Sequence, residues 1–145
     1  AGAPSVATLP TPVPPTPVLA TATPALPPGI YVSAVALDPP EPKHGQYPTF
    51  TVTFINALGQ TVYYKWFVKI YDPDARQSMG ETAKVDATLP PGTSKQSSAA
   101  NWKAIGTSPC RQFIARVFYQ TPDKTILEFP KPGGDSLWHY FAVCQ

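Results

Sequence analysis

Few residues of this chain could carry chemistry, because its 145 residues include only two histidines and two cysteines. His44 lies in the predicted turn Pro42-Lys43-His44-Gly45, and His139 lies between two aromatic residues of a predicted strand. A catalytic triad needs a nucleophile and a carboxylate beside such a histidine. The chain has no Gly-x-Ser-x-Gly motif to supply the nucleophile, so the sequence predicts a protein that is not an enzyme.

No cofactor or metal is expected either. Asp72 and Asp74 could offer oxygens to Ca²⁺, but that ion takes about six to eight oxygen ligands. We therefore interpret Asp72-Pro73-Asp74 as the turn that ends a strand. Cys110 and Cys144 have no further Cys or His at zinc-ligand spacing.

Charge and hydropathy argue against two classes of partner. The chain carries 11 Lys+Arg and 9 Asp+Glu without a basic run, so nucleic acid is not expected. No apolar stretch approaches the roughly 18 residues of a membrane span. A start at Ala1, without Met or an apolar signal core, is typical of a secreted chain whose signal peptide has been removed. We therefore expect an extracellular or cell-surface location.

The distribution of proline divides the chain into two parts. Nine of the 20 prolines fall within residues 1–28, and no charged residue precedes Asp38. Residues 1–28 are thus predicted to be a Pro/Ala/Thr-rich extended arm or linker. Residues 29–145 form a body that is long enough to bury its own core.

The arm has several interpretations. Prolines at nearly every second residue of Thr11–Pro17 favour polyproline II, as in a semi-rigid spacer. However, spacers are usually kept soluble by charge, and this segment has none. Two proline-free stretches, Ser5–Leu9 and Val18–Thr23, could pair with a sheet edge. The apolar side chains that could anchor such an assembly arm are Val6, Leu9, Val13, Val18, Leu19 and Leu26. Threonines near proline also fit O-glycosylation, with candidate sites at Thr8, Thr11, Thr16, Thr21 and Thr23.

The body has the pattern of an all-β domain. Period-two alternation, clearest at Phe50, Val52 and Phe54, indicates half-buried strands. The predicted strands are Gly29–Leu37, Tyr47–Asn56, Thr61–Tyr71, Glu81–Leu89, Thr93–Trp102, Arg111–Gln120, Thr125–Phe129 and Leu137–Cys144. Seven to eight short strands and no helical period predict a two-sheet antiparallel β-sandwich. The predicted core comprises Phe50, Val52, Phe54, Trp66, Val68, Ile70, Phe113, Ala115 and Val117.

The two cysteines stand at the ends of two predicted neighbouring strands. An antiparallel register that matches Cys110 with Cys144 places Val117 opposite Leu137. A disulfide is then expected, which would stabilise the fold by roughly 3–4 kcal/mol and indicate an oxidising compartment. Two free buried thiols are the alternative.

One surface feature could bind a partner. In the strand from Thr61 to Tyr71, alternate side chains are predicted to point away from the core. This candidate contact face comprises Tyr63, Lys65, Phe67, Lys69 and Tyr71. Exposed aromatic patches tend to be interfaces, for a sugar or for another protein. Alternatively, cross-strand neighbours and lysine stems cover these rings.

Several motifs of the body resemble those of a known family. They are Gly45-Gln46, the strand and turn Phe50–Gly59, Ile70-Tyr71-Asp72, Leu89-Pro90-Pro91-Gly92-Thr93 and Phe113–Tyr119. Over about Gly29–Tyr119 the chain is similar to the cell-adhesion-related domain found in bacteria (CARDB). The resemblance implies an immunoglobulin-like fold and an extracellular role as a spacer, adhesion domain or assembly subunit. It carries over turns rather than catalytic residues.

Two functions follow as expectations. The first is a non-catalytic extracellular structural protein, a homo-oligomer or homopolymer that assembles through its arm into a surface filament or similar assembly. The second is a monomeric binding or adhesion module for a carbohydrate or protein ligand, held on a Pro/Thr-rich spacer.

Overall fold

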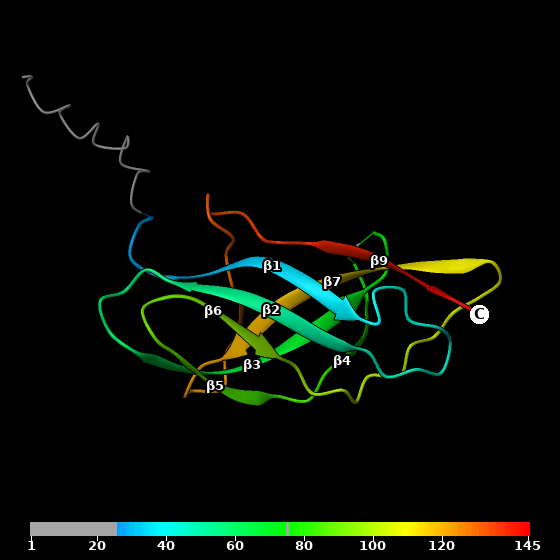
Figure 1. Ribbon diagram of the computed structural model, residues 1–145, viewed down its shortest axis with the longest axis horizontal. Coiled ribbons are helices and arrows are strands. Elements are labelled where there is room, and N and C mark those ends of the chain that lie inside the picture. The colour runs from blue at the N-terminus through cyan, green and yellow to red at the C-terminus, as the bar shows by residue number, and fades with distance from the viewer. Residues whose placement is uncertain (1–25, 75) are drawn as a thin grey trace, which may run out of the picture.

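The computed structural model describes residues 26–74 and 76–145 of the chain. Within these residues all regular structure is β: nine strands form two antiparallel sheets, and no helix occurs (Figure 1). The predicted all-β sandwich is confirmed. The count exceeds the seven to eight strands predicted, because an additional strand, Ser78–Glu81, precedes Val85–Leu89.

The two sheets differ in size. The smaller sheet has the order β1-β2-β6, and its strands are β1 (Ile30–Asp38), β2 (Thr49–Asn56) and β6 (Gly92–Ser97). The larger sheet is centred on β3 (Val62–Tyr71) and β7 (Cys110–Gln120), which pair with each other. Its outer strands are β4 (Ser78–Glu81) and β5 (Val85–Leu89) beside β3, and β8 (Ile126–Glu128) and β9 (His139–Cys144) beside β7.

The core lies between the sheets and is rich in aromatic rings. All nine predicted core residues are buried, with exposures of 2% or less. Phe54 of β2 meets Trp66 of β3 edge to face, with ring centroids 5.3 Å apart. Because burial of one large apolar side chain stabilises a fold by about 1.5–3 kcal/mol, this alternating set is the main source of stability.

The predicted strand Glu81–Leu89 is two strands, which accounts for the additional strand. β4 pairs with the end of β3 and β5 with its beginning. Between them Thr82 is 1% exposed, donates its N–H to Val68 O (2.8 Å) and accepts the Val68 N–H on its hydroxyl (3.0 Å). The hydroxyl thus satisfies a buried donor where the ladder is interrupted.

The predicted strand Thr93–Trp102 is also shorter than expected and ends at Ser97. Ser98 bonds Phe50 through its N–H and its hydroxyl. Trp102 therefore lies in a connection rather than in a strand, yet its side chain is buried.

The disulfide between Cys110 and Cys144 is present, and its predicted register is confirmed. The predicted pairing of Val117 with Leu137 is wrong, because the β7–β9 ladder ends at Ala115 and His139. Beyond that point β7 pairs with β8, and the Phe129 N–H donates to Val117 O (3.1 Å). Phe129 is 2% exposed, so burial of its ring explains why this shorter strand replaces β9.

Candidate interaction surfaces

The two histidines have structural surroundings. His44 N–H donates to Cys144 O (2.7 Å), and its Nδ1 accepts the Gly106 N–H (3.0 Å). His139 stacks on Phe141 with an interplanar angle of 13°, and burial lowers its pKa. Within residues 26–74 and 76–145, no hydrogen bond joins either imidazole to a hydroxyl or a carboxylate. This geometry does not assemble a nucleophile with a base.

The Asp72 carboxylate serves a turn. It accepts the N–H groups of Arg76 (3.2 Å) and Gln77 (3.5 Å), which agrees with the interpretation of this segment as the turn that ends β3. In the part of the chain that the structure describes, no group of three or more His, Cys, Asp or Glu residues could hold a metal ion.

The residues of the predicted contact face differ in their exposure to solvent. Tyr63 and Lys65 are exposed, whereas Lys69 and Tyr71 are half-buried. Phe67 points away from the core as predicted, but it is only 1% exposed. Its availability for a contact was therefore predicted wrongly.

The cover over Phe67 comes from neighbouring strands. Phe118 of β7 stacks on it with centroids 6.1 Å apart. The ammonium groups of Lys84 and Lys69 lie 4.8 Å and 5.9 Å from its centroid. The alternative interpretation, in which cross-strand neighbours and lysine stems cover the ring, holds for Phe67.

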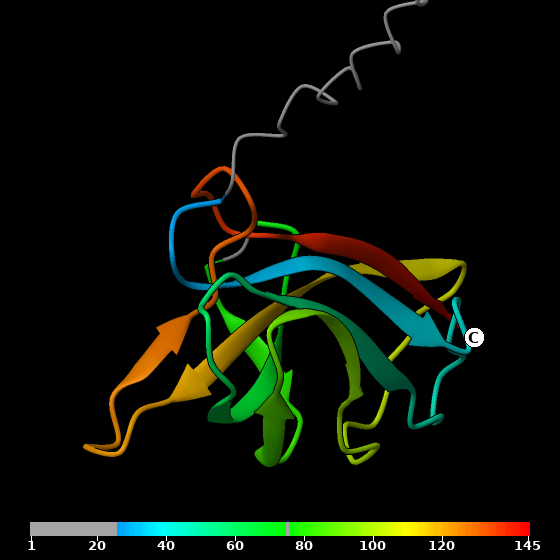
Figure 2. The ribbon, with the colours of Figure 1, turned by 60° about the vertical axis from the view of Figure 1, so that its left-hand side comes forward.

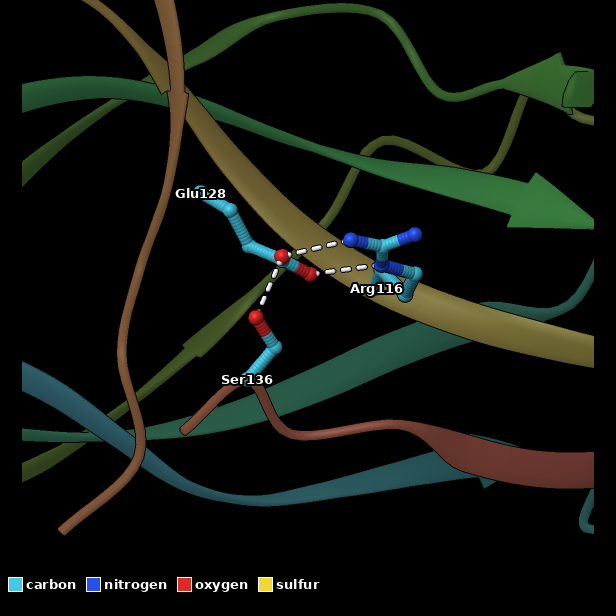
Figure 3. A network of polar contacts seen from close by, with 3 residues as sticks. All are labelled: Arg116, Glu128 and Ser136. Atoms are coloured by element: carbon cyan, nitrogen blue, oxygen red, sulfur yellow. Dashed lines mark hydrogen bonds and ion pairs between the residues drawn. The ribbon is translucent and has the colours of Figure 1, made fainter. Parts of the chain in front are cut away.

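An ion pair organises the same side of the larger sheet. Arg116 of β7 donates two hydrogen bonds to Glu128 of β8, at 2.7 Å and 2.6 Å, and Ser136 donates a third to that carboxylate at 2.6 Å (Figure 3). The two paired side chains are only 18% and 14% exposed. The hydrogen bond to Glu128 raises the pKa of Arg116. Two hydrogen bonds, one to each oxygen of the carboxylate, therefore add to the attraction between the two charges.

Aromatic rings surround the Arg116 guanidinium. Its central carbon lies 4.9 Å from the Tyr71 ring and 5.5 Å from the Phe118 ring, and it lies 5.0 Å from the Trp138 ring. Trp138 and Tyr140 remain 42% and 60% exposed. We call the set formed by Arg116 and the rings of Tyr71, Phe118, Trp138 and Tyr140 the aromatic face. Flat rings of this kind can stack on an apolar ligand surface or on a sugar.

Sequence reasoning missed Arg116, Trp138 and Tyr140 as members of this surface. One signal could have found them. The register that pairs Cys110 with Cys144 places Trp138 opposite Arg116 and Tyr140 opposite Ile114 when it is continued along β9. The aromatic face could therefore have been extended from β3 across β7.

A second surface lies where the two sheets meet, and its first half is the open edge of β1. Phe50 of β2 exchanges hydrogen bonds with Ser98, so its backbone groups point toward β6. Leu37 stands opposite Phe50 in the β1–β2 register, so its own N–H and C=O point away from β2. The same alternation applies to Val35.

The second half is the open edge of β9. Cys144 donates its N–H to Pro42 O (3.3 Å) and accepts the His44 N–H (2.7 Å), so its backbone groups point away from β7. By the alternation of an antiparallel ladder, Ala142 and Tyr140 also direct their backbone groups outward. Among the described residues, no protein group bonds the outward N–H and C=O groups of Tyr140 and Ala142, or those of Val35 and Leu37 on β1.

The two open edges face each other. β1 and β9 lie side by side and run in the same direction (Figures 1 and 2). Between them is a hollow of about 510 Å³, which we call the β1–β9 groove. Its floor is apolar, since Val35, Leu37 and Phe141 are 5–7% exposed. The groove lining is Val35, Ala36, Leu37, Pro40, Glu41, Gln112, His139, Tyr140, Phe141 and Ala142.

Both ends of the groove are closed. At the start of β1, the Val32 N–H donates to Pro130 O (2.9 Å). At the end of β9, the segment Pro42–His44 occupies the edge at Cys144. The open stretch therefore extends over Val35–Leu37 on one side and Tyr140–Ala142 on the other.

Most of the predicted arm residues lie outside the described residues. They are the anchors Val6, Leu9, Val13, Val18 and Leu19, and the threonines Thr8, Thr11, Thr16, Thr21 and Thr23. Leu26 is described and is half-buried. Beside it, the Tyr31 hydroxyl donates to Pro27 O (2.6 Å), which fixes the chain just before β1.

Comparisons with known proteins give no relative. No family model, no curated protein and no solved structure matches this chain. In the described residues no helix is long and apolar enough to cross a membrane.

Proposed function

We propose that this protein is a non-catalytic, extracellular structural subunit that joins copies of itself through its N-terminal arm, in a surface filament or a similar assembly. The observation that supports this proposal is the β1–β9 groove. Open strand edges invite pairing with another chain, and proteins usually cover or charge them. An uncovered pair of edges above an apolar floor is suited to receive an added strand.

The arm has the properties of a segment that docks. Residues 1–28 carry no charge that would have to be desolvated. Their prolines fix φ in advance, which reduces the entropy lost on binding. The 25 residues before Leu26 would reach on the order of 80 Å as polyproline II. A body of 117 residues has a radius of gyration of only about 13 Å, so the arm is long enough to contact a neighbour.

The symmetry of such a contact leads to a filament. An arm that leaves one body and enters the groove of the next makes a heterologous contact. Repetition of a heterologous contact without closure gives an open chain of subunits. The Cys110–Cys144 disulfide supports an oxidising, extracellular location, and the resemblance to CARDB supports an adhesion or assembly role.

The test is the size of the protein with and without its arm. Sedimentation velocity of the full chain should give larger species as concentration rises. A variant that lacks residues 1–25 should stay monomeric and keep the circular dichroism of the full chain. A full chain that remains monomeric at high concentration would refute the proposal.

The aromatic face supports a second candidate function, a monomeric binding module on an O-glycosylated or bare Pro/Thr-rich spacer. The specific observation is the exposure of Trp138 and Tyr140 beside Arg116. A glycan array and a protein-ligand pull-down would test this candidate. Trp138→Ala should abolish a specific signal, whereas Tyr63→Ser should not, because Tyr63 is 77% exposed at the other end of β3.

A further inference from the structure

We infer that the β1–β9 groove of one copy receives residues Ser5–Leu9 of a second copy as an added strand, which bonds to β1 on one side and to β9 on the other. This inference rests on the proposed function and names the surface and the segment that would perform it. The bonding groups on the body are the outward N–H and C=O groups of Val35, Leu37, Tyr140 and Ala142.

The groove is favoured over the free edges of β5 and β6 by its side chains. The free edge of β6 carries the exposed Lys95, and β5 carries the exposed Asp86. Charges on an edge strand oppose the addition of another strand. By contrast, the edge residues Val35–Leu37 and Tyr140–Ala142 contain no charged residue, although Glu41 also lines the groove. The groove also offers two edges. Some Cα atoms of β1 and β9 lie within 8 Å of each other, whereas a strand bonded on both sides needs about 9.6 Å between its neighbours. Insertion therefore requires the two edges to move apart.

The segment Ser5–Leu9 fits the groove in length and composition. It lies between Pro4 and Pro10, and none of its five residues is proline. Each residue therefore keeps the N–H that a strand between two edges needs. Five residues in a strand span about 17 Å, which is sufficient for the open stretch of three residues on each side. Thr11–Pro17 does not fit, since its four prolines remove these donors.

The closed end of the groove favours a second copy over the same chain. The arm leaves the body just before Ile30, next to the start of β1. A hairpin that folded back along β1 would meet the Val32–Pro130 hydrogen bond before it reached Val35. Ser5–Leu9 is separated from Leu26 by 16 residues. As polyproline II these would extend roughly 50 Å, which is enough to cross to a neighbouring body.

Cross-linking between separately labelled full-length chains tests the inference. One preparation carries a cysteine in the donor segment, as Ala7→Cys or Thr8→Cys, so that both side-chain parities are sampled. The other carries Ala36→Cys, an exposed position of β1 that lines the groove. A short thiol-specific cross-linker is added to the mixture, and the native disulfide does not react with it. The matched control replaces Ala36→Cys with Lys95→Cys, an exposed position on the free edge of β6.

The inference predicts a covalent dimer of the two preparations with Ala36→Cys for at least one donor variant, and loss of that dimer with Lys95→Cys. Absence of the dimer, or equal yields at the two positions, would overturn it. A cross-link that forms only within one chain carrying both cysteines would also overturn it, because the arm would then fold onto its own body. Sedimentation of the same samples separates the two proposals. Arm-dependent association without the Ala36 cross-link refutes the groove alone, whereas monomeric samples refute both.

Discussion

The indole of Trp102 packs directly against Gly80, where a side chain would not fit. A Cβ added to Gly80 would lie 2.6 Å from Trp102 Nε1. This contact lets a residue from an irregular connection reach the core. There the Trp102 ring meets the rings of Phe113 and Phe141 at centroid distances of 5.6 Å and 6.0 Å. The absence of a side chain at Gly80 of β4 is therefore a condition for the aromatic core at this end of the sandwich.

Gly80→Ala should destabilise the fold by about 1–3 kcal/mol, since the new methyl group must displace a buried indole. The backbone at Gly80 has φ of +137°, which adds strain for any L-residue. Urea unfolding measures the effect. Gly59→Ala is the matched control, because nothing lies within 4 Å of its added Cβ and its φ is not positive. Equal stability of the two variants would contradict the packing described.

Cys110→Ser should lower the free energy of unfolding by about 4 kcal/mol, because the bond closes a loop with a sequence separation of 34 residues. Thermal unfolding of the variant, and of the wild type with and without reductant, measures this effect. Reduced wild type should resemble the variant. If free thiols are alkylated in the unreduced protein, the pairing of Cys110 with Cys144 is absent.

Glu128→Gln should destabilise the fold by roughly 1–3 kcal/mol, because it leaves the Arg116 guanidinium partly buried without its charged partner. Glu81→Gln is the control, since Glu81 is exposed and makes no ion pair among the described residues. Chemical denaturation of both variants gives the comparison. An effect at Glu128 no greater than that at Glu81 would show that the aromatic cover does not shield the pair from water.

The stability of the fold should fall on acidification because of His139. Burial lowers its pKa in the folded protein below the ordinary value of 6.5. The unfolded chain therefore binds a proton first as the pH falls below about 6.5, and this shifts the equilibrium toward unfolding. Stability is fully present above that pH and is lost between it and the lower pKa of the folded state.

The variant His139→Gln isolates this contribution, since it keeps a polar side chain that does not titrate. The melting temperature of the wild type minus that of the variant should decrease as the pH falls below about 6.5. His44 is present in both proteins and cancels from the comparison. A difference that stays constant from neutral to acidic pH would show that His139 is not the responsible group.

The sequence pattern predicted the parts of this fold that depend on local alternation. Phe50, Val52 and Phe54 alternate with threonines and are buried. β7 and β9 pair in the register expected from the two cysteines as far as Ala115 and His139. Trp102 was placed at the end of a strand, because alternation does not reveal a ring that reaches the core from a loop. Phe67 was assigned to the correct side of its strand but not to a buried environment, because its cover comes from Phe118 and Lys84, which are distant in sequence.

The candidate surfaces were less predictable than the core. The β1–β9 groove depends on which strands lie at the sheet edges and which partners their outward groups find, and neither property is encoded in one strand. The break between β4 and β5 depends on the Thr82 hydroxyl, which bonds Val68 across the sheet. Such features follow from topology rather than from local sequence.

A complementation experiment tests most directly whether the arm of one copy binds the body of another. One protein lacks residues 1–25 and can only accept an arm. The other is full-length Ala142→Pro, which loses one outward N–H and fills part of the groove, so that it can only donate its arm. Full-length Lys95→Pro, altered at an outward position of the β6 edge, is the control and should still self-associate.

The mass of the mixture, measured by light scattering, gives the result. Each protein alone should be a monomer, and the mixture of the acceptor with Ala142→Pro should contain a one-to-one complex and nothing larger. If that mixture contains only monomers while the wild-type chain associates, or if Ala142→Pro still self-associates as the wild type does, the account of an arm bound in the β1–β9 groove is contradicted.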